Sequence, residues 1–337
     1  MKVLEIRQAF GLDHLVSADR PQPQPARGEV LLRMGAASLN YRDLLMVQGA
    51  YNPKQPLPLI PCSDGVGEVV ATGEGVSRVA VGDRVMTLFS QSWLSGDPDR
   101  STLRSTLGGP IDGTLAEYRV FSEQGVSAVP EHLSDAEAAT LTCAGVTAWN
   151  AINKGGVVDE GGTVLVLGTG GVAVFALQFA QLLGAKVIIT SSSDEKLDRA
   201  RELGAVAGIN YRQDPKWAKK VKDLTDGQGV DLVVEVGGAE TLPQSVLAVR
   251  PGGQISLIGN LGGGVAELNL IPVFMRGVRI QGILVGSRQD VEAMSSVISQ
   301  HEMRPVIDRV LSWTETRQAL EHLGAGRHFG KICLRIS

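Results

Sequence analysis

The fold of this 337-residue chain follows from residues 161–205, whose sequence is GGTVLVLGTGGVAVFALQFAQLLGAKVIITSSSDEKLDRARELGA. Thr163–Leu167 is a short apolar run of strand-forming residues, and the glycine-rich turn Gly168–Ala173 follows it directly. Apolar residues then recur at helical spacing as far as Leu183, and Lys186–Thr190 reads as a second strand. This order of strand, turn, helix and strand predicts one βαβ unit.

The small residues of the turn have separate physical roles in this interpretation. Gly168 allows a sharp exit from the strand, Gly170 lacks the side chain that would block a pyrophosphate, and Ala173 lets helix and strand pack closely. The free N–H groups at Gly171 and Val172 then lie at the positive end of the helix dipole, where phosphates bind. The alternative is a turn that only joins strand to helix. It leaves unexplained why bulky side chains are absent from two positions of the turn. We therefore expect a dinucleotide site.

The end of the second strand distinguishes NAD from NADP. An NAD site places Asp or Glu there for the ribose 2′-hydroxyl, whereas an NADP site avoids that charge. Here Ser191 and Ser192 stand at this position and Lys196 follows, which favours NADP(H). The alternative interpretation is that the serines cap the next helix and that Lys196 lies on its solvated face beside Asp194 and Asp198.

Composition narrows the classes of function. The chain is 43% hydrophobic with a formal net charge of −4, which is typical of a globular protein long enough for two domains. No apolar stretch reaches membrane-spanning length and no signal-peptide pattern is present, so a cytoplasmic location without membrane contact is expected. Lys and Arg are scattered, which argues against a nucleic-acid partner. The three cysteines lack metal-binding or disulfide-framework spacing.

The α/β alternation continues after residue 205. Further buried strands are predicted at 207–211, 229–236, 254–259 and 279–286, which completes a six-stranded, doubly wound parallel sheet. Ligands of such sheets bind at the carboxyl ends of the strands. The expected cofactor contacts at those ends include Gly237, Asn260 and Leu284.

The sequence predicts a second domain of different character. Residues 1–125 contain short β-type runs separated by Gly and Pro, which indicates a mostly antiparallel β domain, and residues 288–337 are expected to return to it. Residues 126–287 then form the nucleotide-binding domain. Residues 134–152 read as a capped connecting helix. Residues 89–112 show neither helical nor strand periodicity, and both a functional cover and a flexible insertion remain open.

These elements together resemble the medium-chain dehydrogenase/reductase superfamily over essentially the whole chain. The most specific markers are Pro61–Val70, Gly82–Val85, Gly113–Tyr118 and Phe329–Ile332. The resemblance implies a Rossmann domain and a GroES-like catalytic domain, within the zinc-free, quinone-oxidoreductase-like branch. It also implies a homodimer formed through the edge strand at 279–286.

The resemblance allows the zinc-ligand positions of family members to be compared with the matching residues of this chain. Zinc members carry a Cys in the segment that matches Asn40 and a His-Glu pair in the segment that matches Ser63 and Asp64 of this chain. They carry another Cys or an Asp at the position that resembles Cys143. Only Cys143 is left here, and a catalytic zinc needs three protein ligands. The structural lobe of zinc members would fall in residues 89–112, which contain no cysteine. No metal is therefore expected.

The resemblance also implies cofactor contacts. NADPH-dependent quinone oxidoreductases hold the 2′-phosphate with residues similar to Lys196, Tyr211 and, after a one-residue shift, Arg327. Thr147 resembles the threonine on the nicotinamide side. The cofactor is therefore expected to be NADP(H).

Without a metal, nothing polarises an alcohol oxygen, so the chemistry expected is hydride transfer to an electron-poor acceptor. Quinones and α,β-unsaturated carbonyls are such acceptors. Tyr51 resembles the proton-donating tyrosine of related enoyl reductases, and Asn40 is a candidate to orient the substrate or the nicotinamide. The alternatives are that Tyr51 packs on the proline-rich turn after it, that Asn40 caps a helix, and that Arg42 and Asp43 pair with each other.

Three functions follow from the sequence. The first is an NADPH-dependent reductase of quinones or activated alkenes. The second is an NAD(P)-dependent alcohol or aldehyde dehydrogenase that works without zinc. The third, from a different class, is a sensor or structural protein that binds NADPH without turnover.

Overall fold

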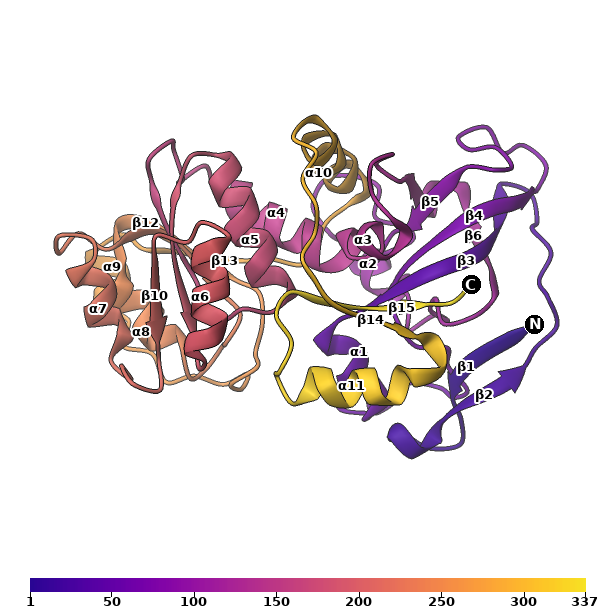
Figure 1. Cartoon of the computed structure of the whole chain (residues 1–337), viewed down its shortest axis with the longest axis horizontal. Helices are drawn as coiled ribbons and strands as arrows, with labels where there is room; N and C mark the ends of the chain where they lie inside the picture. Colours follow the sequence, from indigo (N-terminus) through magenta and orange to yellow (C-terminus); the bar gives the residue numbers. More distant parts are fainter. The chain divides into compact units, whose positions relative to one another are not determined.

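The computed structural model describes residues 1–337 and divides into two compact units, whose elements are labelled in Figure 1. Unit 1 comprises residues 1–146 and 285–337, and unit 2 comprises residues 147–284. None of the helices combines the length and apolar character required to cross a membrane.

The first boundary between the units lies after residue 146, later than the expected residue 125. Residues 126–146 belong to unit 1 because β7 (Val126–Ala128) pairs with β5 (Arg84–Thr87), and α3 (Asp135–Ala138) contacts β3 (Glu29–Leu39). The second boundary, after residue 284, lies close to the expected residue 287. Hydrogen bonding in the sheet, which the local sequence does not reveal, sets the first boundary.

Unit 2 contains the predicted six-stranded sheet, in the order β10-β9-β8-β11-β12-β13, with every neighbouring pair parallel. Its strands are β8 (Thr163–Val166), β9 (Lys186–Ser191), β10 (Ala207–Asn210), β11 (Val230–Glu235), β12 (Val249–Leu257) and β13 (Arg279–Gly282). Its helices are α5 (Gly171–Leu182), α6 (Asp194–Glu202), α7 (Trp217–Asp223), α8 (Leu242–Ala248) and α9 (Ile271–Met275). The order is that of a doubly wound nucleotide-binding fold, which confirms the predicted fold class.

The core of unit 2 explains why the apolar runs became strands. Leu165, Ile188, Val233 and Ile255 come from four adjacent strands, and all are buried in one cluster with residues of the covering helices. A parallel sheet covered on both faces requires such continuous apolar strands.

Unit 1 is a mostly antiparallel β structure, as predicted. Its main sheet has the order β14-β15-β3-β4-β5-β7, with β6 also paired to β3, and β1 and β2 form a separate hairpin. The remaining strands are β1 (Lys2–Ile6), β2 (Leu15–Asp19), β4 (Asp64–Thr72), β6 (Tyr118–Ser122), β14 (Ile307–Ser312) and β15 (Lys331–Arg335). Its helices include α1 (Tyr41–Val47), α10 (Arg288–Gln300) and α11 (Thr316–Gly324).

The C-terminal strand returns to the first domain, which confirms that prediction. In Figure 1, β15 runs beside β3, and the two strands pair antiparallel with Ile332 opposite Leu39. This register brings Lys331 next to the end of β3, where the chain turns into α1. Two segments almost 300 residues apart thus meet at one point.

Two sequence-based expectations were wrong in detail. Residues 134–152 are not one helix, because α3 is followed by a π-helical segment (Leu141–Gly145) and then by α4 (Val146–Asn153). The Gly145 N–H donates to the Thr140 carbonyl, five residues back, at 3.2 Å. Residues 89–112 are not without structure either. They contain α2 (Arg100–Arg104), whose first turn is capped by the Asp99 carboxylate.

Candidate cofactor and substrate sites

The predicted cofactor residues gather at one edge of the unit 2 sheet. Because all six strands are parallel, their carboxyl ends lie along the same edge. Each end carries a candidate: Gly168 after β8, Ser191 at the end of β9, Tyr211 after β10, Gly237 after β11, Asn260 after β12 and Leu284 after β13. Thr147 lies on α4 and belongs to the same unit.

The glycine turn has the backbone that a phosphate site requires. Gly168 has φ of +79°, in the left-handed region, and no other part of the chain approaches the place of a Cβ there within 4 Å. Its N–H donates to the Thr190 hydroxyl at 3.2 Å, which ties the turn to β9. The twelve-residue helix α5 begins at Gly171 with Gly170 as its N-cap and with no capping side chain. The open turn and the uncapped helix end fit a dinucleotide pyrophosphate.

The ends of β9 and β10 lie side by side. The Tyr211 N–H donates to the Ser191 carbonyl at 3.1 Å, and the Tyr211 ring is partly exposed. The helix cap belongs to Ser193, whose hydroxyl accepts from the Lys196 N–H at 3.4 Å. Ser191 and Ser192 therefore do not cap α6, and no acidic side chain occupies this strand end.

Sequence reasoning missed Glu235, which organises the loop after β11. This carboxylate is fully buried and accepts from the N–H groups of Gly237 at 2.7 Å and Gly238 at 3.1 Å. It also accepts from the hydroxyls of Thr241, at 2.6 Å, and Ser245. An acidic residue at the end of an apolar strand, two positions before Gly237-Gly238, was the available signal. Glu235 thus sets the shape of the loop that contains the candidate Gly237.

Unit 1 contains a second cluster, built around Asn40 at the N-cap of α1. The Asn40 side-chain nitrogen donates to Asp64 Oδ2 at 2.8 Å, and its side-chain oxygen accepts from Lys331 Nζ at 2.5 Å. Lys331 Nζ also donates to the Leu39 carbonyl at 2.7 Å and lies 3.9 Å from Asp64 Oδ2. Both ends of the Asn40 amide are therefore engaged within the protein.

Asp64 is the buried anion of this cluster. Its other oxygen accepts from the hydroxyls of Ser63 at 3.1 Å and Thr142 at 3.5 Å. Burial raises the pKa of Asp64 to about 6, although the nearby Lys331 ammonium and the Asn40 amide oppose the shift. From the sequence alone, Lys331 is only a family marker. Its partners lie near the other end of the chain, so the local sequence does not reveal them.

The predicted pairing of Arg42 with Asp43 is confirmed, with 3.4 Å between Arg42 Nη1 and Asp43 Oδ1. Asp43 also closes the first turn of α1 by accepting from the Asn40 N–H at 2.8 Å. Burial raises the pKa of Asp43, and the Arg42 charge opposes this. A cap role for Asn40 and Asp43 thus coexists with the contacts of the Asn40 side chain.

Tyr51 lies beside the same arginine. The Arg42 guanidinium is buried between two rings, 5.0 Å from the Tyr51 centroid and 4.8 Å from the Phe89 centroid. It also donates to the carbonyls of Leu107 and Gly109, which anchors it to the 89–112 segment. Tyr51 is 50% exposed. Arg42 contacts its ring, while the phenol group remains accessible to solvent.

The residues at the positions of the zinc ligands do not fit that metal. No group of three or more His, Cys, Asp or Glu side chains in the chain is arranged to hold an ion. Cys143 is half-buried in the π-helical segment, and burial together with the charge of Asp64 raises the pKa of its thiol. One thiol does not supply the three protein ligands of a catalytic zinc. The Asn40 amide is engaged, and the Lys331 ammonium already faces Asp64.

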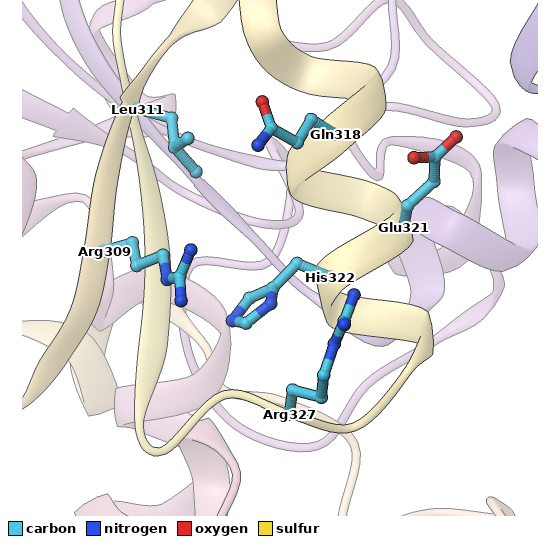
Figure 2. Close-up of a pocket in the computed structure, with 6 residues that line it drawn as sticks. All are labelled: Arg309, Leu311, Gln318, Glu321, His322 and Arg327. Carbon is cyan, nitrogen blue, oxygen red and sulfur yellow. The ribbon is translucent and has the colours of Figure 1, made fainter.

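Arg327 is separated by unit from the other cofactor candidates. It lies in unit 1 and lines a cavity of about 380 Å³ between β14 and α11. Figure 2 shows Arg309 on the strand and His322 on the helix beside it. His322 is paired with Asp308 at 3.0 Å. The role of Arg327 at the 2′-phosphate remains a prediction.

Comparison with known proteins identifies the family to which this chain belongs. A family model described as an alcohol dehydrogenase GroES-like domain matches residues 26–131, and one described as a zinc-binding dehydrogenase matches residues 171–300. A zinc-type alcohol dehydrogenase-like protein of Schizosaccharomyces pombe is 41% identical, over 97% of this chain and 96% of its own length. The chain belongs to the medium-chain dehydrogenase/reductase superfamily.

Other members of the superfamily show its range. An acryloyl-coenzyme A reductase of Sulfurisphaera tokodaii is 28% identical over 94% of both chains. The structure of an NAD-dependent alcohol dehydrogenase is 34% identical over the whole of both chains, with a TM-score of 0.90. Two mycobacterial structures, each 25% identical over the whole of both chains, are a complex with NADPH (TM-score 0.83) and a quinone oxidoreductase (TM-score 0.82).

Proposed function

We propose that this oxidoreductase uses NADPH to reduce quinones or α,β-unsaturated carbonyl compounds and needs no metal. The observation that carries the proposal is the cluster of Asn40, Asp64 and Lys331 in unit 1. Asn40 and Asp64 stand at positions that match zinc ligands in the resemblance, and both are engaged by each other and by Lys331. Without a Lewis acid, an acceptor that is already electron-poor is the substrate best suited to hydride transfer.

The residues at the edge of the unit 2 sheet would hold the cofactor. The turn from Gly168 to Val172 would bind the pyrophosphate through backbone N–H groups. Ser191, Ser192, Lys196 and Tyr211 would bind the 2′-phosphate, since Ser191 stands where an NAD site carries an acid. The nearby Asp194 carboxylate is engaged by the side-chain amides of Asn210 and Gln213. The nicotinamide half would meet Thr147, Gly237, Asn260 and Leu284. Bound NADPH supplies a hydride, and every other requirement of the reaction falls on the protein.

Tyr51 would supply the proton or hydrogen bond to the reduced substrate. Its exposed phenol suits contact with a ligand, and the buried Arg42 beneath its ring fixes the ring position. Asn40 has one amide hydrogen beyond the one given to Asp64, and this hydrogen is available to orient the substrate.

An acceptor panel tests the reaction. NADPH consumption is measured with quinones, enones and enoyl thioesters, and at least one class should be reduced. Tyr51→Phe should then lower kcat by roughly 100-fold if the phenol transfers the proton. Tyr118→Phe, on β6 of the same unit, is the control. Tight NADPH binding without consumption by any acceptor would instead favour a non-catalytic protein.

A second measurement tests the choice of cofactor. Lys196→Ala should weaken NADPH binding by roughly tenfold, since it removes one charged contact to the phosphate, and should leave NADH binding unchanged. Lys219→Ala, which changes an exposed lysine on α7, is the control. Equal loss of both cofactors in Lys196→Ala would contradict a phosphate-binding role.

Zinc-independent alcohol or aldehyde oxidation is the second candidate, favoured by the alcohol dehydrogenases among the relatives. Chelator-treated enzyme that reduces NADP⁺ or NAD⁺ with an alcohol, and does not reduce the acceptor panel, would establish it in place of the leading proposal.

The protein is also proposed to form a homodimer through β13. All four residues of this edge strand are exposed, and the preceding α9 exposes Phe274 and Met275. An unpaired apolar edge of this kind is normally covered. Sedimentation should therefore show about twice the chain mass of 35.7 kDa. Ile280→Asp, on β13, should give the monomer, while Val206→Asp, an exposed apolar position far from β13 in the sequence, should not.

A further inference from the structure

Lys331 is a buried cation that reasoning from the local sequence could not place. Its side chain is only 3% exposed, and its ammonium donates to the Leu39 carbonyl and to Asn40 Oδ1. The Asp64 carboxylate lies 3.9 Å away and is itself fully buried. Charges of this kind persist inside proteins only when they are paired and hydrogen-bonded.

The ammonium also fixes the direction of the Asn40 amide. Lys331 only donates hydrogen bonds and an ionised Asp64 only accepts them, so the Asn40 oxygen must face the lysine and its nitrogen the aspartate. A flipped amide would place two donors together and two acceptors together. The cluster therefore specifies one orientation of a side chain that is a candidate substrate contact.

We propose that Lys331 is the internal cation of this site, a positioning residue that balances the charge of Asp64 and orients Asn40, so that no divalent metal binds there. The proposal rests on the proposed function only for its effect on turnover. The charge balance itself holds whether or not the protein is a reductase.

A double-mutant cycle tests the charge balance. Lys331→Met should lower the folding equilibrium constant by at least roughly 100-fold, because it leaves Asp64 buried without its counter-charge. Adding Asp64→Asn should recover at least roughly tenfold of that loss. If Lys331→Met alone does not fold, recovery of folded protein in the double variant gives the same answer. Additive effects, or two unfolded variants, would overturn the proposal.

An exposed pair in the same unit serves as the matched control. Lys2 Nζ and Asp19 Oδ2 are only 2.7 Å apart, but both side chains are more than half exposed. The same cycle with Lys2→Met and Asp19→Asn should give a coupling of less than about fivefold. A coupling between Lys331 and Asp64 no larger than this would show that burial of the pair does not matter.

Kinetics test the orientation of Asn40. In the folded Lys331→Met/Asp64→Asn variant, kcat with the best acceptor should fall by roughly 10- to 100-fold, while KM for NADPH stays within about threefold. Lys331→Arg should retain most of the rate, because it keeps the charge and the donors. Wild-type turnover in the double variant would overturn the positioning role. If wild type itself reduces no acceptor, the proposed function fails while the stability cycle still decides the charge balance.

Metal analysis tests the last part of the proposal. Wild-type protein dialysed against zinc and then against buffer should retain less than one zinc per chain. One zinc per chain that is lost in Asp64→Asn would overturn the proposal, because it would place a metal in the position assigned to the ammonium.

Discussion

Glu235 of unit 2 and Asp64 of unit 1 are both fully buried carboxylates, yet the two are held in different ways. Every hydrogen-bond partner of the Glu235 carboxylate lies within ten residues along the chain. Those of Asp64 include Asn40, 24 residues away, and Thr142, 78 residues away, and Lys331 comes from the last strand. Glu235 shapes its own loop, whereas Asp64 joins distant segments.

The two carboxylates also differ in the charge around them. Glu235 accepts only from backbone N–H groups and hydroxyls, all of them neutral donors. Asp64 faces the Lys331 ammonium and the second buried acid Asp43, and burial raises its pKa to about 6. The comparison indicates that Glu235 sets the shape of a loop at the candidate cofactor edge of unit 2 and that Asp64 contributes charge to the cluster in unit 1.

Replacement of Glu235 should have the largest effect on stability. Glu235→Ala leaves three buried or part-buried donors without an acceptor and the Thr241 hydroxyl with only the longer contact to the Gly238 carbonyl, and we expect a loss of at least about 3 kcal/mol in the free energy of unfolding. Urea denaturation at pH 7 measures it. Glu240→Ala, which changes an exposed acid five residues later, should stay within about 0.5 kcal/mol of wild type. Equal losses in the two variants would remove the distinction between the buried and the exposed acid.

The pH dependence of stability should single out Asp64. Its pKa in the folded protein, about 6, is above the ordinary value of 3.8, so between these values the folded state binds more protons than the unfolded state. Wild type should therefore lose roughly 3 kcal/mol of stability relative to Asp64→Asn as the pH rises from about 4 to 7. Denaturation of both proteins across this range measures the difference.

The sign of that difference is decisive. Lys331 stabilises the Asp64 charge, and Asp43 and burial destabilise it. A wild type that gains stability over Asp64→Asn with rising pH would mean that Lys331 outweighs burial.

A glycine in the loop that Glu235 holds should show how tightly that loop is built. Gly238 has φ of +82°, and a Cβ there would lie 2.7 Å from the Asn260 Cα. Gly227 has φ of +81° but nothing within 4 Å, so it isolates the backbone strain. Gly227→Ala should cost about 1 kcal/mol and Gly238→Ala roughly 2 to 3 kcal/mol, with weaker NADPH binding in the latter. Equal losses of stability in Gly227→Ala and Gly238→Ala would mean that the loop after β11 moves to accommodate the added Cβ.

The smallest effects should come from one hydroxyl at each acid. The Thr241 hydroxyl lies 2.6 Å from Glu235, whereas the Thr142 hydroxyl lies 3.5 Å from Asp64. Thr241→Val should cost about 1 to 2 kcal/mol and Thr142→Val less than about 0.5 kcal/mol, because hydrogen bonds weaken with length. Thermal denaturation of the two variants compares them directly. The reverse order would show that Asp64 depends on its hydroxyl partners as well as on charge.

What the sequence could predict follows the same division between local and distant contacts. The parallel sheet, the turn at Gly168 and the candidates at the strand ends depend on patterns a few residues long, and all were predicted. Glu235 was local too, but a single acid at the end of an apolar run is a weak signal for a buried carboxylate. The π-helical turn at Gly145 was missed because its residues also suit an α-helix.

The contacts of unit 1 could not have been predicted in this way. Lys331 meets Asn40 because β15 pairs with β3 in one particular register, and no local pattern encodes that register. Arg42 is anchored by the Phe89 ring and by the carbonyls of Leu107 and Gly109, which lie 65 and 67 residues further along the chain. The family resemblance identified Asn40, Ser63 and Asp64 as altered zinc positions, but it did not reveal the cation beside them.

The most direct test is to measure zinc content and NADPH oxidation on one chelator-treated sample with the best acceptor of the panel. We expect less than one zinc per chain, full activity after treatment, and no gain when zinc is added back. Activity that disappears with the chelator and returns with stoichiometric zinc would contradict it.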